Sequence, residues 1–258
     1  MFSYHENKSE NGAHFAKGWD SKMVYNSTDV ANLISKYASS PCIWKDGIRS
    51  KANFAASEWA GLDFDEGMTL DEAIKIFDKY LHVIGTTKNH QKPKGGKVCD
   101  RFRVFIKLSN MCIDVDDYEL TVKLLIKKHG ADKHCYDGGR FFWHCPKIVV
   151  IKCHGETLPV ADATAIRKRK EKRIQKQETI SRYYAEQGEL PGWVNKKLRE
   201  IPTEYTRNNT CFRVAHAMKR CGYSAHKTFE TIFNSNIPKD RSEKVSNEIK
   251  RVVKGVYM

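Results

Sequence analysis

Several features that would assign this chain to a common class are absent from its sequence. No apolar run is long enough to cross a membrane, and the polar start MFSYHENKSENG lacks the apolar core of a signal peptide, so we expect a cytoplasmic protein without a membrane partner. The eight cysteines include no CxxC pair and no regular framework, which favours reduced thiols. No GxxxxGKS/T phosphate loop occurs, so the chain has no helicase motor of that type. No HxH motif occurs, which excludes the metal pair of tyrosine-dependent replication initiators.

Positive charge is present in excess, and it is distributed unevenly. The formal net charge at pH 7 is +14. Residues 1–160 carry 23 Lys and Arg against 20 Asp and Glu, whereas residues 161–258 carry 22 against 11. The excess therefore lies mainly in the C-terminal part of the chain, where it suits a polyanionic partner such as nucleic acid.

Two carboxylates interrupt an apolar run, AGLDFDEGMT, at residues 60–69. The apolar residues Leu62 and Phe64 are typical of a buried β-strand. Because side chains alternate along a strand, Asp63 and Asp65 lie together on the other side. Two such carboxylates repel each other unless a positive group lies between them, and a divalent cation is the usual one. The alternative is a solvated strand edge with two exposed acids.

Hydrophobic periodicity predicts that strands and helices are mixed in the first part of the chain. Helices are expected over residues 28–37, from Leu70 to about Leu81, and from residue 116 to Gly130. Strands are expected around Asp63 and at residues 82–87, 101–108, 140–145 and 147–153. No regular βαβ repeat occurs. The pattern favours an α+β domain with a largely antiparallel sheet, helices on one face and a polar working face on the other.

The last part of the chain has a different pattern. Residues 167–184 predict a charge-dense helical connector, and four short helices are expected around residues 191–200, 207–221, 225–235 and 240–254. These helices predict a small all-α bundle. The expected organisation is a disordered N-terminus at 1–14, a catalytic domain at 15–160, a basic helical linker at 161–185 and a C-terminal helical domain at 186–258.

The order of the motifs resembles a known family. The acidic DFD strand is followed by TTKNH, which ends in His90, by the basic strand RFRVFIKL, and by ADKHCYDGGRFFW. The upstream stretch KDGIRSKANF fits the same pattern. Over about residues 20–150 the chain resembles the archaeo-eukaryotic primase superfamily, especially its phage and plasmid primase-polymerase (Prim-Pol) branch. The resemblance implies a Prim-Pol catalytic domain with a mixed, largely antiparallel sheet, flanking helices and an RRM-like core.

The resemblance also implies roles for individual residues. Asp63, Asp65 and Asp132 resemble the carboxylates that hold two catalytic Mg²⁺ or Mn²⁺ ions. Asp132 precedes Arg140 by the family's spacing, and Asp137 competes with it for the third position. The implied nucleotide-binding residues are Thr87, Lys88, His90, Arg101, Arg103 and Arg140. The family often has a serine where this chain has Lys88, so Thr87 could provide the hydroxyl instead.

Two further sets of residues complete the expected sites. Basic side chains expected to contact nucleic acid are Arg49, Lys51, Arg207, Arg213, Lys219, Arg220, Lys250 and Arg251. The His/Cys doublets at residues 134–135, 144–145 and 153–154 could in principle meet around zinc. Their ligands are adjacent in sequence and the doublets are far apart, unlike the two- to four-residue spacing of structural zinc knuckles, so zinc is not expected.

These features lead to one functional hypothesis and two alternatives. The hypothesis is a template-directed DNA primase-polymerase that makes primers de novo and extends them from NTPs or dNTPs on single-stranded DNA. Its helicase would be a separate chain, and its location would be the host cytoplasm if a phage or plasmid encodes it. The alternatives are a metal-dependent nuclease, which three acids and a basic face would also serve, and a catalytically silent single-strand-binding replication subunit.

Overall fold

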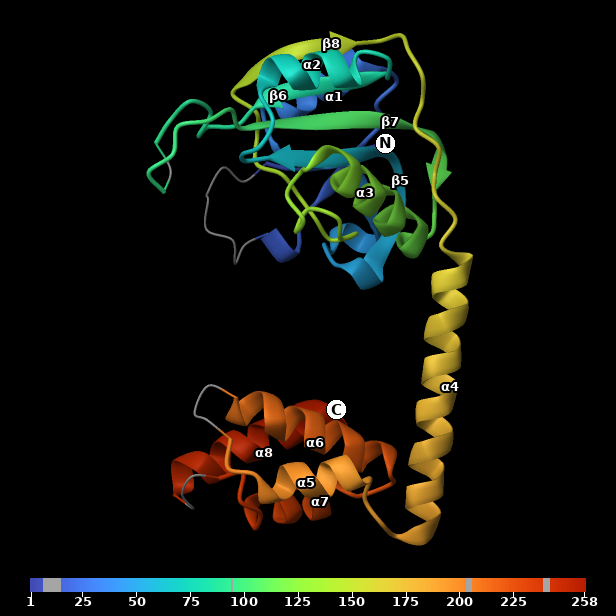
Figure 1. Ribbon diagram of the computed structural model, residues 1–258, viewed down its shortest axis with the longest axis vertical. Coiled ribbons are helices and arrows are strands. Elements are labelled where there is room, and N and C mark those ends of the chain that lie inside the picture. Colours follow the sequence, from blue (N-terminus) through green and yellow to red (C-terminus); the bar gives the residue numbers. More distant parts are fainter. Residues whose placement is uncertain (7–14, 94, 203–205, 239–241) are drawn as a thin grey trace. The chain divides into compact units, whose positions relative to one another are not determined.

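The computed structural model describes residues 1–6, 15–93, 95–202, 206–238 and 242–258. It has two compact units, Met1–Arg167 and Lys168–Met258 (Figure 1). The first unit contains two antiparallel sheets with helices, and the described part of the second is helical. The α4 helix (Thr164–Gln187) crosses the boundary between the units and covers most of the connector expected at 161–185. None of the helices in the described ranges is long and apolar enough to span a membrane.

The first unit is built on a five-stranded sheet in which all neighbouring strands are antiparallel. In sheet order its strands are β4 (Cys42–Trp44), β5 (Phe54–Phe64), β7 (Phe102–Cys112), β6 (His82–Thr86) and β8 (Lys147–Lys152). The antiparallel α+β architecture agrees with the hydrophobic pattern. The RRM-like core stays a prediction.

A second sheet has three strands, and the N-terminal strand is in its middle. In order, they are β2 (Asp20–Lys22), β1 (Phe2–His5) and β3 (Ala38–Ser40). Phe2 is fully buried, and its ring packs edge-on against Trp59 and Phe105 of the larger sheet. The disordered segment expected at 1–14 is therefore wrong for residues 2–5, because an aromatic anchor and two strand neighbours order them. Residues 7–14 lie outside the described residues.

Both faces of the five-stranded sheet are covered. The α2 helix (Leu70–Phe77) and the α3 helix (Val115–His129) pack on the face of Phe102 and its alternate neighbours along β7. The α1 helix (Ser27–Ile34) and the small sheet pack on the opposite face, around Phe105. The prediction that the second face of the sheet is polar is therefore wrong for most of that face. The polar part of that face is the end of the sheet near Asp63 and Arg103.

Local signals set the helix ends in this unit. The capping box is present, since the Thr69 hydroxyl accepts the Glu72 N–H at 3.2 Å and the Glu72 carboxylate accepts the Thr69 N–H at 2.8 Å. The α2 helix ends at Phe77 rather than near Leu81, because the Leu81 N–H donates to the carbonyl of Glu156 instead. The α3 helix ends at His129 and is capped by Gly130, whose φ of 73° suits glycine.

Residues 140–145 do not form the expected strand. This extended segment makes a single bridge to β3, in which Phe142 and Ser39 exchange backbone hydrogen bonds of 2.8 Å. It lies directly against the larger sheet at two glycines. A Cβ atom on Gly61 or Gly85 would come within 2.7 Å of Phe142 and Cys145, respectively. This close packing of the segment against the two glycines fixes its path, although no continuous ladder of backbone hydrogen bonds pairs it with a strand.

Four helices of the second unit share one apolar core. They are α5 (Gly192–Arg199), α6 (Arg207–Arg220), α7 (Ala225–Phe233) and α8 (Glu243–Tyr257). Each corresponds to an expected helix. The Ser224 hydroxyl caps α7 by accepting the Lys227 N–H at 3.2 Å, and Gly222, with φ of 80°, follows the end of α6.

Candidate active site

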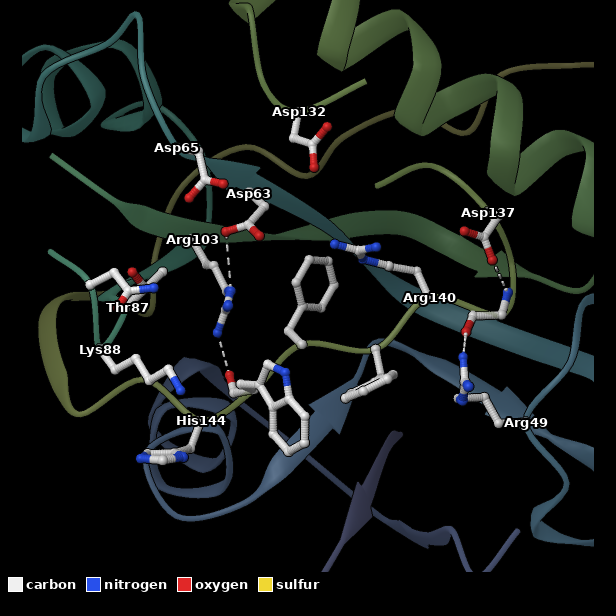
Figure 2. Close-up of a pocket in the computed structure, with 15 residues that line it drawn as sticks. Arg49, Asp63, Asp65, Thr87, Lys88, Arg103, Asp132, Asp137, Arg140 and His144 are labelled. Carbon is white, nitrogen blue, oxygen red and sulfur yellow. Dashed lines mark hydrogen bonds and ion pairs between the residues drawn. The ribbon is translucent and has the colours of Figure 1, made fainter. Parts of the chain in front are cut away.

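A cavity of about 460 Å³ opens at the end of the five-stranded sheet, a size typical of small-molecule sites. The end of β5, strand β7, the residues that follow β6, and the segment from Asp132 to His144 contribute to its wall. Figure 2 shows the carboxylates of Asp63, Asp65 and Asp132 gathered at one side. The structure thus brings the three acids of the sequence prediction into one cavity.

Asp63 is the most deeply buried of the three acids, with 8% of its surface exposed. It lies opposite Arg103 in the β5–β7 register, and the Arg103 Nε donates to its Oδ1 at 3.2 Å. Arg103 also donates to the carbonyl of Trp143 (Figure 2). Burial raises the pKa of Asp63 above its ordinary value, although Arg103 opposes the rise. The alternative interpretation, a solvated strand edge with exposed acids, is therefore wrong for Asp63.

Asp65 follows the end of β5 and is more exposed than Asp63. It lines the same cavity, while Leu62 and Phe64 are buried in the core, as strand alternation predicts. The Arg101 Nε lies 4.0 Å from its Oδ1. Arg101, which directly precedes β7, therefore lies beside Asp65, and Arg103 of β7 lies beside Asp63. The protein itself thus compensates part of the negative charge of the two acids.

Asp132 reaches the cavity from the turn after α3. Its backbone N–H donates to the carbonyl of Asp63 at 2.8 Å, which fixes the turn against the end of β5. Burial raises the pKa of its carboxyl, but the N–H of His134 and the Cys135 thiol outweigh burial, and Arg140 adds to them, so that the pKa is lowered below its ordinary value. A lowered pKa means that this carboxylate is ionised at neutral pH.

Asp137 lines the same cavity, but its carboxylate closes a turn. Its Oδ1 accepts the N–H of Gly139 at 2.9 Å, and its carbonyl accepts the N–H of Arg140 (Figure 2). This local bond is the one that a YDGG sequence favours. Asp132 is therefore the better candidate for the third acid.

Cationic and hydroxyl groups face the acids. Arg140 lines the cavity, its buried Nε has no hydrogen-bond partner among the described residues, and its guanidinium lies 5.9 Å from the ring centre of Phe142. The buried hydroxyl of Thr87 also lacks a partner there. Buried polar groups are normally satisfied, so such orphans indicate a place for a ligand or water. Lys88 and Arg49 also line the cavity.

Three of the predicted residues in the unit Met1–Arg167 are placed outside this cavity. His90 accepts the N–H of Arg101 through its Nδ1 at 3.2 Å. The Arg101 guanidinium is buried and donates to three carbonyls of the loop after β6, those of Asn89, Lys92 and Lys97. Lys51 forms a 2.6 Å ion pair with Glu119 of α3. Their contacts with nucleotide or nucleic acid stay predictions.

The cavity also contains residues to which the sequence analysis gave no role in nucleotide binding. His144 lies in the wall near Lys88 (Figure 2). Phe141 and Trp143 also line the cavity and form an aromatic part of its wall. Arg49 is held over Phe141, with its guanidinium carbon 4.9 Å from the ring centre. A clue was present in the sequence, since the aromatic run follows directly after the predicted Arg140.

The donor chemistry of the cavity suits a hard divalent cation, because three carboxylates line one space and burial penalises the charge on Asp63. The side chains are not arranged as a finished metal cluster. Within the described ranges, no group of three or more His, Cys, Asp or Glu is placed so that it could hold a metal ion. The acids are of the type that Mg²⁺ or Mn²⁺ prefers, and Arg103 donates to one oxygen of Asp63.

Comparisons with known proteins give two distant structural likenesses. No protein-family model matches the chain, and no curated protein matches it. The AEP domain of the primase-polymerase of cyanophage S-2L is 14% identical over 62% of this chain and 77% of that chain, with a TM-score of 0.33. Primase RepB′ is 12% identical over 99% of this chain and 88% of that chain, with a TM-score of 0.34. These values are too low to support a functional argument.

Proposed function

We propose that this chain is a template-directed nucleotidyltransferase of the primase-polymerase type. The observation that supports the proposal is the cavity itself, a space of about 460 Å³ lined by three carboxylates, by Arg140 and by Thr87. The buried Nε of Arg140 and the Thr87 hydroxyl have no hydrogen-bond partner among the described residues. A carboxylate side that suits divalent ions and a cationic side that suits phosphates are the two requirements for binding a nucleoside triphosphate. Single-stranded DNA would be the template, and a helicase would be a separate protein.

In this reaction, different residues of the cavity would bind the metal ions and the triphosphate. Asp63, Asp65 and Asp132 would hold Mg²⁺ or Mn²⁺, which would lower the pKa of the attacking hydroxyl and neutralise the departing pyrophosphate. Arg140 and the Thr87 hydroxyl would contact the triphosphate and hold it in line. Arg103 would keep Asp63 ionised despite its burial.

The aromatic part of the wall would bind the other half of a nucleotide. Phe141 and Trp143 line the cavity and are only partly buried, and the Arg49 guanidinium lies over the Phe141 ring. Bases and sugars pack well on such rings, whereas a cavity that recognised phosphate alone would have no use for them. This favours a nucleotide over an inorganic anion as the bound molecule.

Primer extension separates this function from the nuclease alternative, to which the acids are equally suited. A 5′-labelled primer on a longer DNA template, incubated with the protein, Mg²⁺ or Mn²⁺ and all four dNTPs or NTPs, should become longer. Without nucleotides it should keep its length. Shortening of the primer in both reactions would establish the nuclease, and unchanged length in both would favour the silent binding subunit.

Asparagine at Asp132 should reduce primer extension much more than asparagine at Asp137. Loss of a supporting group near a metal costs about 10- to 100-fold, so loss of a direct ligand at Asp132 should exceed about 100-fold. Asp137→Asn keeps an oxygen that can accept the Gly139 N–H and should cost less than about 10-fold. Steady-state rates for the two variants, with melting temperatures as a control for folding, provide the measurement. The reverse ranking would assign the third acid to Asp137.

A further inference from the structure

The second unit contains two adjoining hollows that the nucleotidyl-transfer chemistry does not use. Their volumes are about 670 and 380 Å³, and α4, α5 and α6 contribute to their walls. Trp193 and Arg213 line both hollows, so the two hollows share part of their walls. All lining residues belong to the unit Lys168–Met258. We call this feature the aromatic groove; the residues that define it are Tyr184, Trp193, Phe212, Arg213, His216 and Arg220.

The rings in the aromatic groove are not needed for the core of this unit. Val194 and Cys211 are buried in that core, yet their neighbours Trp193 and Phe212 expose 44% and 48% of their surfaces. The Phe212 ring packs edge-on against His216, with ring centres 4.4 Å apart. Large exposed rings that line a hollow instead of packing inward indicate a binding surface.

Two arginines of the groove are available for a ligand. Arg213 and Arg220 are exposed on α6, and neither side chain forms an ion pair or hydrogen bond with the described residues. Two other basic residues predicted to bind nucleic acid are engaged within the unit. Arg207 forms a 2.7 Å ion pair with Glu248, and Lys219 donates to the carbonyl of Val256 at 2.8 Å.

The charge of the groove favours an anionic occupant. Glu200 also lines the smaller hollow, but the Nζ of Lys197 lies 2.5 Å from its carboxylate and compensates its charge. Residues 161–258 carry twice as many basic as acidic side chains, 22 against 11. An apolar protein helix would use the rings but would leave both arginines without partners.

We propose that the aromatic groove binds single-stranded nucleic acid, with unpaired bases stacked on Trp193 and Phe212 and phosphates bound by Arg213 and Arg220. Stacking needs a free base face, which a duplex does not offer, and it is tolerant of sequence. The choice of a DNA strand as the probe rests on the proposed function. Binding to this groove needs neither nucleotide nor divalent ion, so it can be tested independently of catalysis.

The first test asks whether the bases themselves contribute to binding. The full-length protein is titrated, in EDTA and without nucleotides, with fluorescent oligothymidylate and with an abasic strand of the same length and charge. The thymidylate strand should bind at least about 5-fold more tightly, because stacking adds a contribution for each base. The Trp193→Ala/Phe212→Ala variant should lose this preference. Tyr25→Ala, which removes an exposed ring of the first unit, should keep it.

The second test asks whether the two arginines contact phosphates. For Arg213→Gln/Arg220→Gln, the slope of log affinity against log salt should fall by about 0.7 for each lost contact on a single strand. Lys227→Gln/Lys244→Gln removes the same charge from α7 and α8, outside the groove, and should leave the slope nearly unchanged.

Photocrosslinking with 5-iodouracil in the strand locates the contact directly. Crosslinks should map to the peptides that contain Trp193 or Phe212, and they should be lost in the double alanine variant. Asp65→Asn, whose carboxylate is more exposed than that of Asp63, should crosslink like the wild type even if it makes no product, so failure of catalysis and failure of this proposal remain distinguishable. Equal affinity for base-bearing and abasic strands, tighter binding of duplex, or crosslinks confined to other peptides would overturn the proposal.

Discussion

Asp63→Asn is expected to reduce nucleotide incorporation by more than about 100-fold, because it replaces a carboxylate that would hold the catalytic ions with a neutral amide. The measurement is the steady-state rate of primer extension in Mg²⁺ and in Mn²⁺. Asp78→Asn is a matched control, since Asp78 forms an exposed ion pair with Lys152 on the surface and does not line the cavity. It should extend primers at the wild-type rate.

The same substitution should also destabilise the protein, which complicates its interpretation. Asp63 and Arg103 are both buried, and removing one partner of a buried ion pair costs about 3–5 kcal/mol. Asp65→Asn separates catalysis from folding, since the Asp65 side chain is 44% exposed whereas that of Asp63 is 11% exposed. We expect Asp65→Asn to lose activity to a similar degree with little change in melting temperature. Wild-type extension by Asp65→Asn would rule out the assigned site.

Arg140→Gln is expected to lower nucleotide incorporation by about 10²- to 10³-fold, the usual loss when one donor to a reacting oxyanion is removed. Its guanidinium lines the cavity, and its buried Nε has no hydrogen-bond partner among the described residues. The KM for nucleotide should rise and kcat should fall, while affinity for single-stranded DNA should change little. Arg140→Lys keeps the charge but not the planar donor set, so it should recover only part of the activity.

Arg49→Gln is the informative comparison, because Arg49 lines the same cavity but its guanidinium is already bonded to the carbonyls of Phe15 and Gly139 at 2.8 and 2.9 Å. Its loss should lower the melting temperature more and affect the nucleotide KM less than the loss of Arg140. Unchanged nucleotide kinetics in Arg140→Gln, together with a collapse of DNA affinity, would move Arg140 from the nucleotide to the template.

Strand alternation and helix signals predict much of the fold because they act locally. The alternation at residues 62–65 correctly predicts that Asp63 and Asp65 share a side, and the Thr69 capping box correctly predicts the start of α2. The strand expected at 140–145 fails because its path is set by contact with Gly61 and Gly85, which are distant in sequence. The N-terminal strand is missed for a similar reason, since the burial of Phe2 depends on rings far along the chain.

The surroundings of the site residues also depend on contacts between segments that are distant in sequence, so the sequence predicts them only in part. The sequence identifies the acids, but it cannot show that the Arg101 guanidinium faces the carbonyls of the loop after β6 while Arg103 faces Asp63. Strand alternation places Arg101 and Arg103 on the same face of the expected strand, yet the two guanidinium groups have different surroundings. The aromatic groove likewise cannot be predicted from the sequence, because Tyr184 of α4 and Phe212 of α6 line the same hollow only after the helices pack.

Synthesis without a primer on templates of a single base decides whether the cavity performs templated nucleotidyl transfer. Oligothymidylate or oligodeoxycytidylate is incubated with the protein, Mn²⁺ or Mg²⁺, and one α-labelled nucleotide at a time, and the products are resolved by length. We expect labelled oligomers from adenine nucleotides on thymidylate and from guanine nucleotides on cytidylate, and none with Asp63→Asn or Asp65→Asn. Absence of products under all conditions, or products whose composition ignores the template, would contradict the proposed function.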